Sequence, residues 1–317
     1  MNPSVDFCVV TYNNADTIED CVRSILEHAP ASGIRVLDNS PGSTTMAELE
    51  RLAVGNPRIS VTSAQGNLGF GRACNQLATE STAEWVVFLN PDARLDRFSL
   101  DLGGYIGADV VGAEVFSPEG TLDATAGPER DLGRELGLRW FRRLDRVPGG
   151  KAVGVGFVSG AALAMRRPAF LELGGFDSDR YFMYYEDIDL CMAARRAGGQ
   201  IWRDPSWRVT HLGGHSARRD HLTALKRSHE SARNYHDKWE RGAVPFTALS
   251  LVEAAIKSSI ALVMGRVGST TRRTQLALTA YLFRRLLAEL SGAARRRDAN
   301  GMTRPAQATA EADPPDQ

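Results

Sequence analysis

Residues 5–40 read VDFCVVTYNNADTIEDCVRSILEHAPASGIRVLDNS. The first seven of these residues are mostly apolar and β-branched, which is typical of a buried strand. Apolar side chains then recur at helical spacing from Ile18 to Leu26, and a second short strand ends at Asp38. A strand, a helix and a second strand in this order predict two parallel strands joined by a crossover helix.

The same alternation continues through the first 90 residues. Helices are expected near residues 46–52 and 71–78, and strands near residues 58–62 and 84–89. This order predicts an α/β fold with a Rossmann-like, mostly parallel sheet that is flanked by helices.

Polar side chains stand at the ends of two of the expected strands. In doubly wound sheets, ligands bind in the crevice at the carboxyl ends of the strands. The residues placed at such ends are Asp38, Asn39, Asn90 and Asp92. We therefore expect a ligand site at this edge of the sheet.

The pattern changes after residue 109. The string DVVGAEVFSPEGTL predicts a hairpin with its turn at Pro-Glu-Gly, and GVGFVSGAALAMRR predicts a further buried strand. A helix is expected over residues 221–241. Residues 127–151 form a polar, arginine-rich connection to which the sequence assigns no element.

Composition is that of an ordinary soluble α/β protein. The chain has 317 residues, of which 43% are hydrophobic and 24% are charged, and its net charge is zero. Its four cysteines are widely scattered without a Cys-x-x-Cys pair, which favours reduced, buried thiols. The N-terminus has neither a basic region nor a long apolar stretch, so the sequence predicts a cytoplasmic protein.

Residues 181–198 read YFMYYEDIDLCMAARRAG and crowd three carboxylates, Glu186, Asp187 and Asp189, behind five bulky side chains. Acidic residues favour the first turn of a helix, so the cluster is compatible with a purely structural helix start. It is equally compatible with a catalytic acid cluster. Local sequence leaves both interpretations open.

Three further motifs contain groups that bind ligands in other proteins. FLNPDA at residues 88–93 places Asp92 after a buried strand, although such an acid is often only a turn residue. QGNLGFGRACN at residues 65–75 is a glycine-containing loop before a helix, which lets backbone N–H groups approach a phosphate or sugar. VTHLGGHS at residues 209–216 offers imidazoles as metal ligands.

The order of the strings VVTYNN, LDNS, NLGFGRACN, FLNPDA, GFVSGAALAMRR, YEDIDL and VTHLGGHS resembles family-2 glycosyltransferases. More narrowly, it resembles the bacterial rhamnosyltransferases that build cell-wall and lipid-linked glycans. The resemblance covers residues 5–216. It implies a GT-A-like fold, a nucleotide-diphosphate sugar as donor, and a divalent cation, Mg²⁺ or Mn²⁺, as cofactor.

The resemblance also implies roles for individual residues. Asp187 matches the general base, and Glu186 is expected to hold the acceptor. His211 matches a metal-site histidine, and Asp92 matches the last acid of the family's Asp-x-Asp motif, whose first acid is replaced here by Asn90. The expected donor-binding residues are Thr11, Asn13, Asp38, Asn67, Gly69, Asn90 and Asp92. Tyr184, Tyr185 and Trp202 are expected to stack on sugar rings of the acceptor, with core packing as the alternative for each.

The predicted function is therefore inverting transfer of a sugar, L-rhamnose from dTDP-rhamnose, to a glycan or a polyprenyl-diphosphate-linked acceptor. One alternative keeps the fold but uses UDP-galactofuranose, UDP-GlcNAc or a GDP-sugar. A second alternative is a non-catalytic glycan-binding protein with a degenerate site. No nucleic-acid-binding motif accompanies the basic charge, and nothing in the sequence predicts the oligomeric state.

The sequence predicts three regions: a glycosyltransferase domain over residues 1–240, a basic amphipathic helical extension over 241–292, and a disordered tail over 293–317. Between residues 241 and 297, ten Arg and Lys residues face two acids, a net charge of +8. Leu249, Val252, Ile256, Ile260 and Val263 form an apolar stripe at helical spacing.

This stripe and the basic charge predict peripheral binding to an anionic membrane on its cytoplasmic face, with packing on the catalytic domain as the alternative. The longest uncharged run is about ten residues, shorter than the roughly 20 residues of a membrane span.

Overall fold

The computed structural model describes residues 3–40, 42, 44–132, 151–212, 221–239, 242–263 and 269–291. The chain forms two compact units, Met1–Phe246 and Thr247–Gln317. Most of the arginine-rich connection and the C-terminal tail, residues 133–150 and 293–317, lie outside the described residues.

The first 90 residues fold as four strands alternating with three helices: β1 (Val5–Thr11), α1 (Ile18–His28), β2 (Gly33–Asp38), α2 (Thr44–Ala53), β3 (Ile59–Ser63), α3 (Phe70–Glu80) and β4 (Trp85–Leu89). β1 is parallel to both β2 and β4, and β2 is parallel to β3. The predicted parallel, doubly wound arrangement is therefore confirmed for this half of the sheet.

The remainder of the N-terminal unit contains β5 (Ala93–Phe98), a 3₁₀ turn (Leu102–Gly104), β6 (Val110–Phe116), β7 (Ala126–Gly127), β8 (Val153–Gly154), β9 (Phe157–Val158), β10 (Ala162–Arg166), α5 (Arg167–Glu172), α6 (Glu186–Arg196), β11 (Ile201–His211) and α8 (His221–Lys238). β5 and β11 were not expected from the sequence. The helix expected over residues 221–241 is confirmed as α8.

Within the described residues, the main sheet has the strand order β3-β2-β1-β4-β10-β6-β11-β5, and β8 pairs with β11. β10 is antiparallel to both β4 and β6, so β4 and β6 run in the same direction, and β11 is parallel to β6. The carboxyl ends of β1, β2, β4, β6 and β11 therefore reach one edge of the sheet. β5 runs antiparallel to β11 and begins at that edge.

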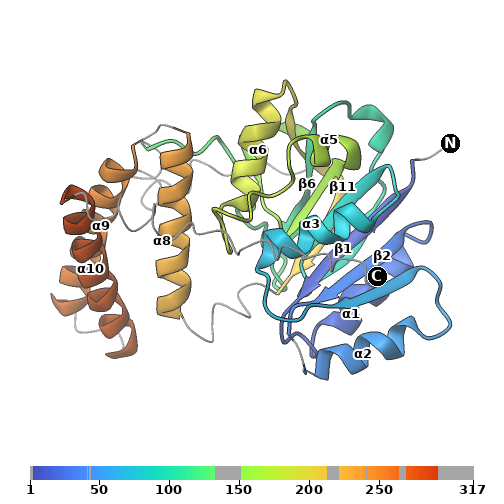
Figure 1. The fold of residues 1–317 in the computed structure, drawn as a ribbon, viewed down its shortest axis with the longest axis horizontal. Coiled ribbons are helices and arrows are strands. Elements are labelled where there is room, and N and C mark those ends of the chain that lie inside the picture. Colours follow the sequence, from blue (N-terminus) through green and yellow to red (C-terminus); the bar gives the residue numbers. More distant parts are fainter. Residues whose placement is uncertain are drawn as a thin grey trace, which may run out of the picture. The chain divides into compact units, whose positions relative to one another are not determined.

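Two hydrophobic cores lie on opposite faces of the sheet, because successive side chains of a strand point to opposite sides. On β1, Cys8 and Val10 belong to the core under α3, α5 and α6, whereas Phe7 and Val9 belong to the core under α1 and α2. Figure 1 shows these two helical layers. All four cysteines are buried and free, as the sequence predicted.

The hairpin expected after residue 109 is only a single bridge. β6 ends at Phe116, the chain turns with a hydrogen bond of 2.8 Å from Ser117 N to Thr121 O, and Phe116 then pairs with Leu122 alone. β6 pairs instead with β10 and β11 in the middle of the sheet. The turn therefore lies where the sequence predicted it, and Asp123 N also donates to Val115 O at 2.8 Å, but the antiparallel return is too short to count as a strand.

The C-terminal unit contains α10 (Ser269–Leu290) and most of α9 (Ala243–Val263). Polar pairs join the two helices: Thr247 Oγ1 lies 3.3 Å from Glu289 Oε1, and Ser258 Oγ lies 2.9 Å from Thr279 Oγ1. Large apolar side chains of both helices are 45–68% exposed, namely Val252, Ile256, Ile260, Leu276, Phe283, Leu287 and Leu290. The two helices thus bury polar groups beside Ala254, Leu278 and Leu282, while many of their larger apolar side chains are exposed.

α9 meets the length and hydropathy of a membrane span over Ala243–Ile260, although length and composition alone are weak evidence for one. The longest uncharged run in the sequence, about ten residues, had argued against a membrane span. The two charges inside the window, Glu253 and Lys257, form an ion pair of 2.7 Å one turn apart, which reduces their cost in an apolar environment.

Candidate active site

Two tyrosines turn the chain into α6. Tyr184 and Tyr185 both have left-handed backbone conformations, with φ of 73° and 68°. Such values cost about 1–3 kcal/mol for a non-glycine residue and persist only where the surroundings impose them. Tyr185 is the residue before the first turn of α6, so this backbone conformation directs Glu186 and Asp187.

The two adjacent carboxylates have different surroundings. Asp187 Oδ2 accepts a hydrogen bond of 2.8 Å from Gly160 N, and Oδ1 accepts one of 2.8 Å from Ile188 N. Glu186 is buried, and its Oε2 has no hydrogen-bond partner among the described residues. The backbone donors therefore favour the ionised form of Asp187 over that of Glu186.

The pKa shifts of the two carboxyl groups also favour ionisation of Asp187 over Glu186. Burial raises the pKa of Glu186 well above its usual value, and the Asp187 carboxylate raises it further. Burial also raises the pKa of Asp187, but its backbone hydrogen bonds and the charge of Arg130 oppose this rise. These effects favour ionisation of Asp187 over ionisation of Glu186.

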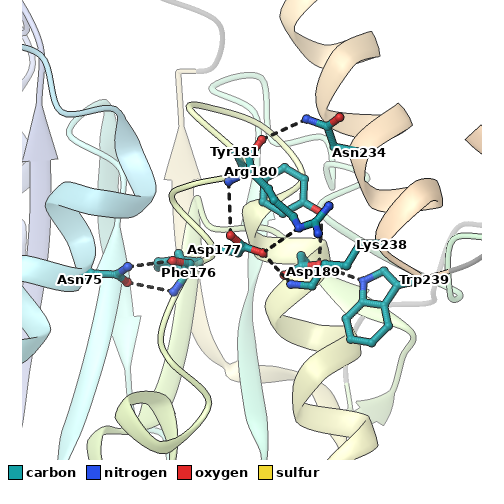
Figure 2. Close-up of polar contacts among 9 residues, drawn as sticks. All are labelled: Asn75, Phe176, Asp177, Arg180, Tyr181, Asp189, Asn234, Lys238 and Trp239. Atoms are coloured by element: carbon teal, nitrogen blue, oxygen red, sulfur yellow. Dashed lines mark hydrogen bonds and ion pairs between the residues drawn. The ribbon is translucent and has the colours of Figure 1, made fainter. Parts of the chain in front are cut away.

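The third carboxylate of the motif, Asp189, is fully engaged in structure (Figure 2). Its Oδ2 accepts from Lys238 Nζ at 2.6 Å, and its Oδ1 accepts from Trp239 Nε1 at 2.8 Å and from the Tyr181 hydroxyl at 3.2 Å. Lys238 also pairs with Asp177 at 2.8 Å. Asp189 thus anchors α6 to the end of α8.

Further contacts fix the loop before α6. The Asn75 amide donates to Phe176 O at 2.7 Å and accepts from Phe176 N at 2.8 Å, as Figure 2 shows. Asn234 Nδ2 on α8 donates to Arg180 O at 3.1 Å. The loop is therefore held by α3 at one end and by α8 along its length.

A second polar cluster forms where β4, β5 and β11 meet. His211 Nε2 lies 3.1 Å from Asp92 Oδ1 and 3.3 Å from Asn90 Nδ2. Asp92 is buried, and His211 pairs with Ala93 across the β11–β5 ladder. The sheet topology thus brings together the three residues that the sequence connected with a metal and a diphosphate.

These residues fit a divalent cation with two protein ligands. Two neighbouring ligands of an octahedral ion at about 2.1 Å are roughly 3 Å apart, close to the 3.1 Å between Asp92 Oδ1 and His211 Nε2. No group of three His, Cys, Asp or Glu side chains suited to a metal occurs in the described part of the chain. The remaining ligands would have to come from substrate and water.

The glycine loop is clamped by a residue outside the predicted set, Asn39. Its Nδ2 donates to Gly69 O at 3.1 Å, and its Oδ1 accepts from Leu68 N at 3.2 Å. Asn67 Oδ1 accepts from Gly69 N at 3.0 Å. Gly69 has φ of 80°, and a Cβ there would lie 2.6 Å from Phe182 O, so only glycine fits.

The three residues expected at the nucleoside lie at the ends of β1 and β2. Thr11 and Asp38 are opposite one another in the ladder and are fully buried, whereas Asn13 is exposed. Ser40 N donates to Asp38 Oδ1 at 3.0 Å, and Asn13 N donates to Ser40 Oγ at 3.0 Å. Asp38 therefore shapes the turn that presents Asn13.

Trp202 does not belong to this site. It lies at the start of β11, where it pairs with Val111 and packs on Tyr105 with ring centroids 6.3 Å apart. It lies nine positions before His211 along the strand, a separation of roughly 25–30 Å. The expectation that Trp202 contacts the acceptor was wrong, because β11 was not recognised as one strand spanning the sheet.

The two tyrosines are adjacent to the carboxyl pair. Tyr185 packs on Tyr235 of α8, with ring centroids 5.8 Å apart. Burial raises the pKa of the half-buried Tyr184, and Glu186 would raise it further when ionised.

Sequence reasoning missed several contributors to the site, namely Asn39, Gly160, Arg130, Lys238 and Trp239. Asn39 had a signal, because it was placed at a strand end. Gly160 lies within the string GFVSGAALAMRR but carries no side chain to single out, whereas Arg130, Lys238 and Trp239 lie outside the motifs and are recruited by tertiary contacts.

The mixed sheet is flanked by helices and carries an acid–histidine cluster and a glycine loop at its carboxyl edge. A buried acid pair lies beside them. This combination places the protein in the GT-A-like class of glycosyltransferases. The family model for glycosyl transferase family 2 matches residues 6–173, more than half of the chain. The protein belongs to this family and is a glycosyltransferase, as the sequence predicted. Asp187 and His211 lie beyond the matched stretch.

Relatives of known name support the narrower branch. The chain is 28% identical over 272 residues to an N-acetylglucosaminyl-diphospho-decaprenol L-rhamnosyltransferase of Mycobacterium tuberculosis, covering 75% of this chain and 87% of that protein. It is 36% identical over 64 residues to the rhamnosyltransferase WbbL of Escherichia coli, covering 20% of this chain and 24% of that protein.

Among solved structures, a mannosyltransferase of Pyrobaculum calidifontis in complex with GDP-Man and Mn²⁺ has a TM-score of 0.54 at 19% identity, covering 92% of this chain and 88% of that one. This similarity supports the fold.

Proposed function

We propose that the protein transfers L-rhamnose from dTDP-rhamnose to a saccharide carried on a polyprenyl diphosphate, with inversion at the anomeric carbon. The proposal rests on the similarity to the mycobacterial enzyme along most of both chains. The observation that carries the chemistry is the unequal acid pair, in which Asp187 has two backbone donors and Glu186 has an unpartnered oxygen.

In this mechanism Asp187 is the general base. It accepts the proton of the acceptor hydroxyl, while that oxygen forms a bond to the anomeric carbon and the bond from this carbon to the nucleotide diphosphate breaks. Gly160 N and Ile188 N hold the two oxygens of Asp187, which fixes the direction of its remaining lone pairs. Glu186 stays protonated beside it and hydrogen-bonds the acceptor.

The donor lies at the carboxyl edge of the sheet in this proposal. Asn13 and the turn shaped by Asp38 receive the nucleoside, and the loop at Asn67 and Gly69 faces the sugar and phosphates. Asp92 and His211, with Asn90 beside them, would hold the divalent cation. When bound, this cation neutralises charge that develops on the departing diphosphate.

Product formation tests the function. Purified protein is incubated with a short-chain polyprenyl-diphosphate N-acetylglucosamine and with dTDP-rhamnose, UDP-galactofuranose, UDP-GlcNAc or GDP-mannose in turn. We expect a rhamnosylated product and no comparable product from the other donors. Transfer from another donor would replace the proposed substrate, and an absence of transfer from every donor would contradict the function.

We also propose that the C-terminal unit binds an anionic membrane surface peripherally. Its exposed apolar side chains on α9 and α10 supply burial, and its excess of arginine supplies attraction at about 1 kcal/mol for each basic residue near the surface. Anionic vesicles should therefore co-sediment the protein, less so at high salt.

Replacing two of the exposed residues, Ile256→Asn with Phe283→Asn, should weaken this binding without unfolding the protein. Alkaline carbonate should release the bound protein. Resistance to carbonate would mean that α9 spans the bilayer instead.

A further inference from the structure

Arg227 is an exposed cation beside the catalytic segment. Its Cζ lies 5.0 Å from the ring centroid of Phe182, which is itself 41% exposed. One turn later on α8, Ser231 Oγ donates to Met183 O at 2.9 Å. Two successive turns of α8 therefore lie against the chain that leads into α6, and Arg227 is at the solvent end of this contact.

Arg227 has no acidic partner in the described residues, unlike Arg180 and Arg195, which come before and after the acid pair in the sequence. Arg180 pairs with Asp177 at 3.5 Å, and Arg195 pairs with Glu129 at 2.7 Å. The N–H groups of a guanidinium that is not paired with a carboxylate remain available to a ligand. Their planar arrangement allows two parallel hydrogen bonds to the oxygens of a phosphate. An unpaired arginine at this position is therefore a candidate anion-binding group.

The position of Arg227 relative to the acid pair indicates which anion it meets. Phe182, on which Arg227 stacks, precedes the first residue of α6, Glu186, by four residues. In the same segment, Phe182 O accepts from Phe70 N of the glycine loop at 3.2 Å. Arg227 thus contacts the segment that joins the expected donor loop to the acid pair.

We propose that Arg227 binds the diphosphate of the acceptor. This inference rests on the proposed function, in which the reacting hydroxyl belongs to the sugar attached directly to that diphosphate. An anion one sugar away from Asp187 would lie beside Tyr184 and Phe182, where the guanidinium stands. Arg227 would then be a specificity residue that distinguishes lipid-diphosphate acceptors from neutral sugars, and it takes no part in proton transfer.

A second group of arginines serves as a comparison for anion binding. A cavity of about 480 Å³ at the β5–β11 edge is lined by residues that include Arg94, Arg97 and Arg208. Its arginines differ from Arg227 because Asp96 pairs with Arg94 at 3.0 Å and with Arg208 at 3.8 Å. Arg208 is exposed to a similar degree and provides a matched control.

The experiment compares two acceptors with the same sugar and the same short alkyl chain, one linked through a diphosphate and one through a neutral glycosidic oxygen. In full-length protein, Arg227→Gln should raise KM for the diphosphate acceptor by about 10- to 100-fold, the range for losing a charge-assisted contact. The KM for the neutral acceptor and for the donor should change less than about twofold. Arg227→Lys should be intermediate, since it keeps the charge and loses the fork.

Three results would overturn the inference. Equal losses with both acceptors in Arg227→Gln would mean that Arg227 only supports the loop. Selective loss of the diphosphate acceptor in Arg208→Gln, with Arg227→Gln unaffected, would place the diphosphate in the β5–β11 cavity. An absence of transfer by wild-type protein to either acceptor from any donor would reject the proposed function itself, and this inference with it.

Discussion

The two halves of the candidate site are constructed differently. Glu186 and Asp187 are neighbours in sequence and compete for one negative charge at the buried start of α6. Asp92 and His211 are 119 residues apart and meet only because β4, β5 and β11 end at the same edge. The comparison shows that local sequence can place an acid pair, while its surroundings decide which member ionises. The strand-end cluster depends on sheet topology for its existence.

The largest effect on kcat should come from the adjacent acids Glu186 and Asp187. Asp187→Asn should lower kcat by 10²–10⁴-fold with little change in donor KM, because the amide cannot accept the acceptor's proton. Steady-state kinetics with Glu186→Gln as the matched variant would check this. A larger loss of kcat in Glu186→Gln than in Asp187→Asn would exchange the roles of the pair and remove the contrast drawn above.

Changes at Asp92 and His211 should instead alter how activity depends on the divalent metal ion. Removing divalent ions with EDTA should abolish transfer, and Asp92→Asn should raise the Mg²⁺ or Mn²⁺ concentration needed for half-maximal rate by about 10- to 100-fold. Metal titrations of the variant and of Asp187→Asn would separate the two halves, since the Asp187 variant should keep the wild-type requirement. Full activity in EDTA would exclude a metal role for Asp92 and His211.

A smaller effect is expected where tertiary contacts fix the local pair. Lys238→Met leaves Asp189 without its cation and should lower the free energy of unfolding by about 1–3 kcal/mol, with kcat reduced as α6 loses its anchor. Arg72→Met is the control, because the Arg72–Asp179 pair is exposed on both sides. Chemical denaturation would measure both variants, and equal losses would show that the Asp189 contact has no special role.

The smallest effect concerns pH and stability. Because the pKa of Glu186 is raised in the folded protein, folded chains retain a proton that unfolded chains release, and stability falls as pH rises through the window above the usual value of 4.5. Glu186→Gln removes this cost, so its Tm should exceed that of wild type by about 2–4 °C at pH 8 and match it near pH 4. A Tm difference that stays constant with pH would assign the effect to packing.

Much of the fold could be predicted because its signals are local. The strands and helices from Val5 to Leu89 are long, periodic and separated by turn residues, so each was found close to its observed bounds. β5 was missed because its sequence, ARLDRF, carries the charges of an edge strand. β11 was missed because Pro205 interrupts it, and the sheet accommodates this proline where the register shifts between Asp204 and Arg208.

The missing strand also explains the one residue that the structure removes from the site. Without β11, Trp202 and His211 could be assigned to the same region. As one strand, they lie at opposite edges of the sheet. The strand-end residues Asn90 and Asp92 were found because the strand before them is a short, fully buried run.

The sequence by itself determined the family, the parallel half of the sheet and the acidic start of α6, because periodicity, turn residues and ordered motifs act over a few residues each. Only the tertiary structure decided which carboxylate is free to act. Gly160 N donates to Asp187, while Asp189 is paired with Lys238 and accepts a hydrogen bond from Trp239. A carboxylate's charge depends on the burial and the donors around it, and those come from distant parts of the chain.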